Sequence, residues 1–177
     1  MTTQTLSQTK WQVDPAHSEF IFKVRHMMIS TVTGHFNSFN VAATSAGDNF
    51  DGADIEVTID VDSISTKNTD RDNHLKSDDF FNAAEYPQIK FQSTHFEGST
   101  LKGHLTIRDI TKEVTLQVEQ NGIAVDPYGQ TKAGFEISGE INRKEYNLNW
   151  NAITEAGNVV VSDTVKLAFE IQLVKQA

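Results

Sequence analysis

The densest group of side chains able to do chemistry lies at residues 71–74, where an arginine, an aspartate and a histidine occur within four positions. Arg71 could bind an anionic head group, and Asp72 and His74 could exchange protons, so one hypothesis is an acid–base or head-group site. The alternative, which we favour, is an ion pair and cap that hold an irregular segment in place. Because neighbouring residues do not face each other, the partners of Arg71 and Asp72 are expected elsewhere in the fold.

Arg143, which follows Asn142, is the second polar candidate. Asn and Arg side chains at such a position can fix a bend by hydrogen-bonding backbone groups. Arg143 could instead pair with a diphosphate head group. We favour the structural role.

Metal and cofactor chemistry find little support in the sequence. The six histidines show neither the i, i+4 pairing of a helical zinc site nor a His-X-His pair on one strand. The chain has no cysteine, which excludes disulfides, thiolate metal sites and cysteine catalysis. Nucleophile-elbow, Walker and dinucleotide-binding motifs are also absent. We therefore predict no metal site, no catalytic residue and no cofactor.

Composition places the chain among single-domain globular proteins, with 177 residues of which 38% are hydrophobic. A net charge of −9 argues against nucleic acid and anionic surfaces as partners. No apolar run approaches the roughly 20 residues that cross a bilayer. The polar N-terminus lacks a signal-peptide pattern, so we expect a soluble cytoplasmic protein, or a periplasmic one if a signal was removed.

Alternation with a period of two dominates the sequence and predicts strands. Phe20, Phe22 and Val24 share one face of the first clear example, and similar runs recur near residues 55–61, 89–91, 105–107, 114–118, 135–141 and 165–173. Turn signals separate them: Asn121-Gly122, which suits a type I′ turn, Glu97-Gly98-Ser99, Asp126-Pro127-Tyr128-Gly129 and Ala156-Gly157-Asn158. Several short strands joined by tight turns favour an antiparallel barrel or sandwich.

Two segments depart from this pattern. Residues 1–10 are predicted to be a flexible polar tail that precedes a domain at 11–177. Residues 68–84 lose the alternation and predict one or two short helices, capped by Thr69 or Asp70 and by Ser77. The inward strand faces are rich in phenylalanine, but periodicity alone does not distinguish a filled core from an open cavity.

Several motifs together resemble the YceI-like family of lipocalin-like, polyisoprenoid-binding proteins. They are WQVDPAHSEFIFKVRH with TVTGHF, VTIDVDSISTKNTDRDNHLKSDDFFNAAEYPQIKFQST, GHLTIRDITKEVTLQVE, FEISGEINRKEYNL and VSDTVKLAFEIQLVK. The resemblance covers roughly residues 11–174 and implies an extended eight-stranded antiparallel barrel. In that family a glycine usually follows the aromatic residue of the Asn-Arg segment, whereas here Asn147 follows Tyr146.

The resemblance also implies a function, namely binding or carrying a polyprenyl chain or an isoprenoid quinone without catalysis. The residues expected to contact that ligand are Phe20, Phe22, Val24, Phe36, Leu75, Phe80, Phe81, Phe91, Leu105, Ile107 and Phe135. Two alternatives remain: an enzyme acting on the lipid head group, and a β interaction module with a solid core. A homodimer is also left open.

Overall fold

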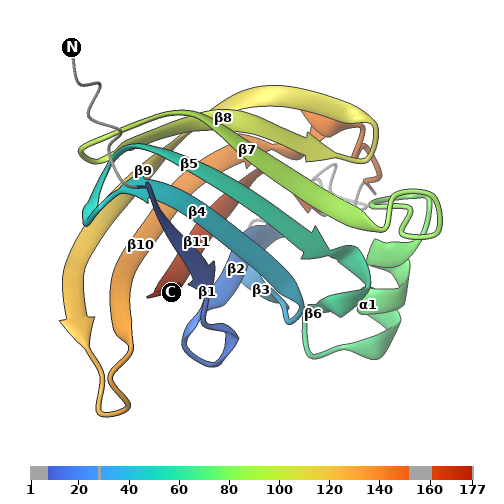
Figure 1. Cartoon of the computed structure of the whole chain (residues 1–177). Coiled ribbons are helices and arrows are strands. Elements are labelled where there is room, and N and C mark those ends of the chain that lie inside the picture. The colour runs from blue at the N-terminus through green and yellow to red at the C-terminus, as the bar shows by residue number, and fades with distance from the viewer. Residues whose placement is uncertain (1–7, 28, 152–160, 177) are drawn as a thin grey trace.

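Antiparallel strands that curl into a closed barrel make up most of the molecule (Figure 1). The computed structural model describes residues 8–27, 29–151 and 161–176. Its helical elements in that part of the chain are α1 (Thr69–Lys76) and the 3-10 helices η1 (Pro15–His17), η2 (Val61–Ser63) and η3 (Arg143–Tyr146). The strands are β1 (Gln8–Val13), β2 (Glu19–His26), β3 (Ser30–Phe36), β4 (Phe39–Ala46), β5 (Asn49–Asp60), β6 (Ile64–Ser65), β7 (Gln88–Glu97), β8 (Thr100–Ile107), β9 (Ile110–Val125), β10 (Thr131–Asn142) and β11 (Val161–Lys175).

Eight of these strands form the barrel itself. Hydrogen-bonded neighbours follow the order β1, β4, β5, β7, β8, β9, β10 and β11, and pairing of β11 with β1 closes the ring. One edge of β11 serves two partners: Leu173 pairs with Val13 of β1, and Leu167 pairs with Phe22 of β2. The β2–β3 hairpin therefore continues the sheet beyond the closed ring. The predicted eight-stranded antiparallel barrel is confirmed.

Aromatic side chains from distant strands fill one end of the barrel. The ring of Phe50 lies 5.0 Å from that of Trp11 and 4.9 Å from that of Phe135. The buried indole N–H of Trp11 donates to the Ser45 hydroxyl at 2.8 Å. Because a buried indole needs a hydrogen-bond acceptor, this bond allows Trp11 to close the end of the barrel.

The segment without alternation forms α1 and the turns after it, as predicted. Asn68, and not Thr69 or Asp70, is the N-cap, because its side chain accepts from the backbone N–H of Arg71 at 3.0 Å. Ser77 ends this helix and does not begin a second one, since its backbone N–H donates to the His74 carbonyl at 3.1 Å.

The Asn121-Gly122 pair lies inside β9, so the prediction of a hairpin turn there is wrong. Asn121 is the extra residue of a bulge opposite β10, and Gly122 has a φ of 101°. The same tolerance of positive φ suits a bulge as well as a turn. The chain reverses at residues 126–129, where the predicted turn is confirmed and the Asp126 carboxylate accepts two backbone N–H groups.

The structure also bears on three smaller features of the sequence. The predicted tail is too long, because β1 begins at Gln8 and residues 8–10 pair with β4. The turn at residues 97–99 is confirmed between β7 and β8, whereas the turn predicted at 156–158 lies outside the described residues. Asn147 has a φ of 61°, the left-handed conformation that glycine adopts readily and asparagine tolerates.

Candidate functional site

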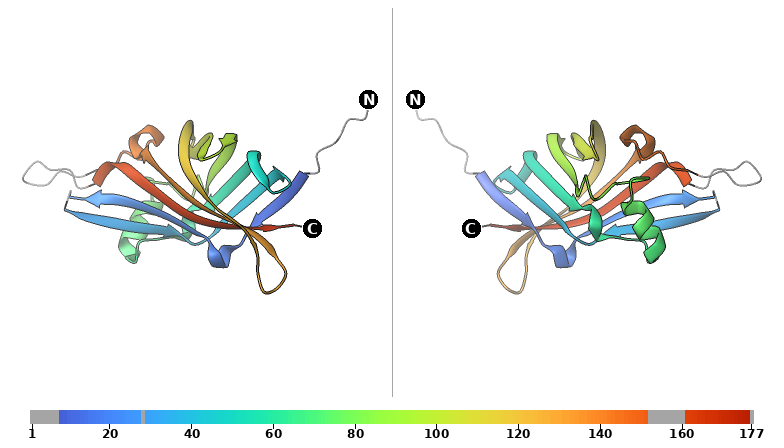
Figure 2. Two further views of the ribbon diagram at one scale, coloured as in Figure 1. Left: turned by 90° about the vertical axis from the view of Figure 1, so that its left-hand side faces the viewer. Right: turned by 90° about the vertical axis from the view of Figure 1, so that its right-hand side faces the viewer.

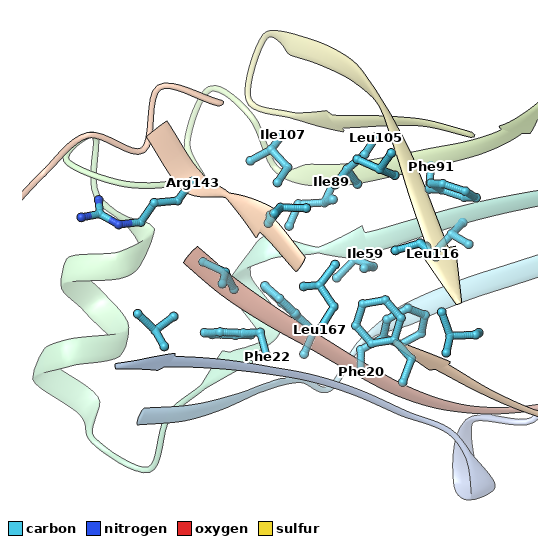
Figure 3. A pocket seen from close by; sticks show the side chains of 18 of the residues that line it. Phe20, Phe22, Ile59, Ile89, Phe91, Leu105, Ile107, Leu116, Arg143 and Leu167 are labelled. Carbon is cyan, nitrogen blue, oxygen red and sulfur yellow. The ribbon is translucent and has the colours of Figure 1, made fainter. Parts of the chain in front are cut away.

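The barrel encloses a cavity of about 530 Å³ whose wall is almost entirely apolar (Figure 3). Its volume falls in the range of about 300–1,000 Å³ in which proteins bind small molecules. All eleven residues expected to contact a ligand line this cavity: Phe20, Phe22, Val24, Phe36, Leu75, Phe80, Phe81, Phe91, Leu105, Ile107 and Phe135. The inward faces thus surround a space instead of filling it, while contact of each residue with a ligand stays a prediction.

The cavity is closed at one end and opens at the other. Phe96 and Leu101, at the closed end, are buried. Val24 and Val32 of the β2–β3 hairpin and Leu75 of α1 line the opposite end and are partly exposed. Within the described residues β3 pairs on its outer edge only with the two residues of β6, so α1 and its following turns complete the wall there. The mouth therefore lies between the β2–β3 hairpin and α1.

Two glycines leave room for the rings that line the wall. Gly34 lies directly opposite Phe22, and a Cβ at position 34 would come within 2.1 Å of the ring. Gly103 accommodates Phe91 in the same way, with a separation of 2.4 Å. Each ring can therefore lie over the neighbouring strand instead of projecting across the barrel, which keeps the interior open.

Arg71 and Asp72 both bind Thr66, which is 4% exposed and follows β6. Asp72 accepts from the backbone N–H and the hydroxyl of Thr66 at 2.8 and 2.5 Å. Arg71 donates to the hydroxyl and the carbonyl of Thr66 at 2.8 and 2.7 Å. These bonds satisfy polar groups that water does not reach and fasten α1 to the preceding chain. Arg71 also borders the cavity.

His74 brings an imidazole to the mouth of the cavity. Its Nε2 lies 2.8 Å from a carboxylate oxygen of Asp79, and both side chains are partly exposed. The imidazole ring meets Trp150 and Phe80 edge-on, at centroid distances of 4.7 and 5.1 Å. His74 thus braces α1 against Trp150 while remaining within reach of a ligand at the mouth.

Arg143 is 3% exposed and directs its donors to the backbone. In Figure 3 its guanidinium points away from the apolar side chains. Burial lowers the pKa of Arg143, and the charge of Asp163, 3.9 Å away, opposes that shift. Its nitrogens donate to the carbonyls of four residues, Leu148, Trp150, Val161 and Ser162. Arg143 therefore joins the chain after η3 to the start of β11, in keeping with the structural role.

Several residues that line the cavity are not among the ligand contacts predicted from the sequence. Five alternating residues of β11 line the cavity, and their period-two pattern could have identified them: Val165, Leu167, Phe169, Ile171 and Leu173. Trp150 also lines it but belongs to no described strand, so periodicity gives no signal there.

Metal sites and membrane-spanning helices are the last two features to consider. Among the described residues, no group of three or more His, Asp or Glu side chains is arranged to hold a metal ion. In the same part of the chain, no helix is long and apolar enough to cross a membrane.

A closed antiparallel barrel around an apolar cavity defines a class of proteins, the lipocalin-like barrels. The YceI-like domain model matches residues 11–173, and the chain belongs to the YceI-like family. The resemblance drawn from the sequence motifs is thereby confirmed.

Several bacterial proteins resemble the chain over most of its length. A UPF0312 protein of Staphylococcus aureus strain USA300 is 40% identical over 159 residues, covering 89% of this chain and 93% of the relative. The crystal structure of a Campylobacter jejuni YceI protein is 31% identical, covers 100% of both chains and superimposes with a TM-score of 0.71. A polyisoprenoid-binding domain from Saccharophagus degradans shares the fold at 14% identity, with 97% and 100% coverage and a TM-score of 0.70.

Proposed function

We propose that this protein binds a long-chain isoprenoid lipid, a polyprenyl chain or an isoprenoid quinone, inside the barrel and carries it without catalysis. The cavity of about 530 Å³, with an apolar wall and polar groups at its mouth, is the observation that carries the proposal. The Saccharophagus degradans domain of the same fold is described as polyisoprenoid-binding, which supports the ligand class.

Burial of an apolar chain can supply the affinity. Each buried CH₂ group contributes roughly 0.8 kcal/mol, so ten carbons contribute about 8 kcal/mol, near micromolar affinity before ordering costs. Polar side chains at the mouth, Arg71 and His74 among them, line the cavity and in this proposal contact the head group. Such contacts select among lipids more than they strengthen binding.

The two alternative functions receive less support. Arg71 and Asp72 are engaged with Thr66, and Arg143 with backbone carbonyls, so the enzyme hypothesis is left with the partly exposed pair of His74 and Asp79. The interaction module requires a solid core, and the enclosed cavity argues against one.

Replacing Phe22 with Trp tests the proposal, because the larger ring would occupy space that a ligand needs. We expect Phe22→Trp to fold stably and to bind polyprenol or isoprenoid quinone severalfold more weakly in a fluorescence titration. Phe39→Trp is the matched control, since Phe39 packs beside Phe20 but does not line the cavity.

Equal binding by the two variants, or no binding by the wild type, would count against the proposal. In a filled core the larger ring would instead destabilise the fold by typically 1–3 kcal/mol. Chemically altered lipid after incubation would favour the enzyme.

A further inference from the structure

One side of the cavity mouth is a cap, residues 69–86, which is made of α1 and the turns that follow it. Figure 2 shows α1 at the end of the barrel toward which the β2–β3 hairpin projects. The cap brings Leu75, Phe80 and Phe81 to the cavity wall. The backbone N–H groups of residues 80–83 all donate to carbonyls within the cap. The cap is therefore a self-contained unit that lies beside the barrel.

Hydrogen bonds attach the cap to the rest of the fold at two places. At its beginning, α1 is bound to Thr66 and Asn68 of the segment that leads into it. At the other place, the Arg108 guanidinium donates to the carbonyl of Phe80 at 3.1 Å. Among the residues that the structure describes, Arg108 alone connects the cap by hydrogen bonds to the eight barrel strands and the turns between them. The polar contact between cap and barrel wall thus depends on one side chain.

The Arg108 side chain also reaches the chain that follows η3. The nitrogen that binds Phe80 donates to the carbonyl of Asn147 at 3.2 Å. Trp150, which lines the cavity, follows in the chain, and Arg143 binds its carbonyl at 2.8 Å. The ring of Trp150 meets that of Phe80 at a centroid distance of 5.5 Å. Arg108 therefore holds the cap against a segment that Arg143 fixes independently.

Two features of Arg108 cost free energy. It lies in the turn between β8 and β9 with a φ of 57°, the left-handed region that glycine adopts more readily. Its Nε is buried and has no hydrogen-bond partner among the described residues. Because a buried donor without a partner is unfavourable, movement of the cap that admits water to Nε recovers part of this cost. The closed arrangement is thus weakened relative to an open one.

We propose that Arg108 is a clasp that holds the cap against the barrel, and that its release lets the apolar ligand enter and leave. The inference rests on the proposed function, since it concerns passage through the same mouth. With the clasp closed, Phe80 and Trp150 narrow the mouth; outward movement of the cap about its two ends widens it. Arg108 acts through these two residues and is therefore a positioning residue. Because opening precedes both entry and exit, the clasp sets both rates more than the affinity.

Stopped-flow kinetics of polyprenol binding to the full chain test the inference. In Arg108→Met, which keeps a long apolar stem without donors, association and dissociation should both become severalfold faster. The dissociation constant should change by roughly twofold or less, because a clasp that opens equally for entry and exit shifts no equilibrium. Arg108→Gly should behave in the same way, and it keeps the turn because glycine suits a φ of 57°.

Two further variants are controls for the loss of the arginine. Arg108→Lys keeps a cation with hydrogen-bond donors and places a methylene where the unpaired Nε lies, so it should restore slow exchange of polyprenol. Lys102→Met removes an exposed cation from β8, the strand that precedes Arg108, and should leave both rates unchanged.

Movement of the cap is measured separately, in the protein without added lipid. The chain has no cysteine, so Asn73→Cys in α1 and Lys112→Cys in β9, both at exposed positions, provide two unique sites for spin labels. Pulsed electron paramagnetic resonance should show a narrow distance distribution with Arg108 in place. In Arg108→Met and Arg108→Gly the distribution should broaden toward longer distances.

Equal rates in the wild type, Arg108→Met and Arg108→Gly would overturn the inference. Faster dissociation without faster association would also overturn it, since that result indicates a lost contact with bound ligand. Unchanged spin-label distances in both variants would do the same. A wild type that binds no polyprenol would count against the proposed function alone, and the spin-label distances would then decide whether Arg108 holds the cap.

Discussion

The position of the Phe22 ring depends on Gly34, which has no side chain. The ring covers Gly34 and lies 5.4 Å from the ring of Phe36. In Gly34→Ala the new Cβ would come within 2.1 Å of the Phe22 ring, which must swing into the cavity. We expect severalfold weaker ligand binding in a titration with polyprenol.

Gly134→Ala is the control for this prediction. The nearest atom to a Cβ at position 134 is the Asn121 Cβ at 3.6 Å, an ordinary contact, and the cavity is unaffected. If Gly34→Ala bound ligand as tightly as Gly134→Ala, the Phe22 ring would not border the space that a ligand occupies.

A second single residue, Asp72, contributes to the stability of the fold. Asp72→Ala removes the acceptor of two buried donors of Thr66, so the free energy of unfolding should fall by about 1–3 kcal/mol. Chemical denaturation measures this loss. Asp70→Ala, in the first turn of the same helix, controls for the helix dipole, worth about 0.3–1 kcal/mol. Equal losses in both variants, or intact stability with loss of ligand, would contradict a structural Asp72.

At the level of the elements, salt bridges of Lys132 join η1 to the β9–β10 hairpin at the closed end of the barrel. Lys132 lies 2.6 Å from a carboxylate oxygen of Asp14 and 3.5 Å from one of Asp126. Hydrogen bonds from Lys132 and then His17 lower the pKa of Asp14 from 3.8 to about 2. This carboxylate therefore stabilises the fold above its unfolded-state pKa, and that contribution is lost as the pH falls from 3.8 towards 2.

Melting temperatures of the wild type and Asp14→Asn between pH 2 and pH 6 should therefore converge as the pH falls. The wild type should melt higher at pH 6, and the difference should shrink below the unfolded-state pKa of 3.8. Asp109→Asn, a change at an exposed turn, should show no such convergence. Parallel curves for wild type and Asp14→Asn would exclude this linkage.

The elements also show how far sequence reasoning reaches. Period-two alternation is local, so it predicted most of the strands, although not the start of β1, and even the inward residues of β2. The Asn121-Gly122 pair was ambiguous because a bulge and a turn use the same backbone conformation. Trp150 and the closure of β11 on β1 depend on contacts between distant residues, which no local pattern records. The open cavity depends on Gly34 and Gly103 lying beneath particular rings, which requires the register of paired strands.

At the scale of the whole molecule, the two ends of the barrel differ. Trp11, Phe50 and Phe135 seal one end through a tilted and an edge-to-face ring contact. At the other end β11 pairs with β2 and no longer with β1. The sheet therefore diverges around α1 and the cavity mouth. A barrel that is closed at one end and open at the other can take up a long apolar chain tail first and leave the head group near His74. This asymmetry is what a carrier of a long lipid needs.

Organic extraction of the purified protein, followed by mass spectrometry of the extract, tests the isoprenoid cargo most directly. We expect the wild type to release an apolar lipid whose mass series is spaced by isoprene units, or an isoprenoid quinone. Phe22→Trp, purified in parallel, should release far less. A wild-type extract without isoprenoid lipid, from protein that also fails to bind added polyprenol or quinone, would contradict the proposed function.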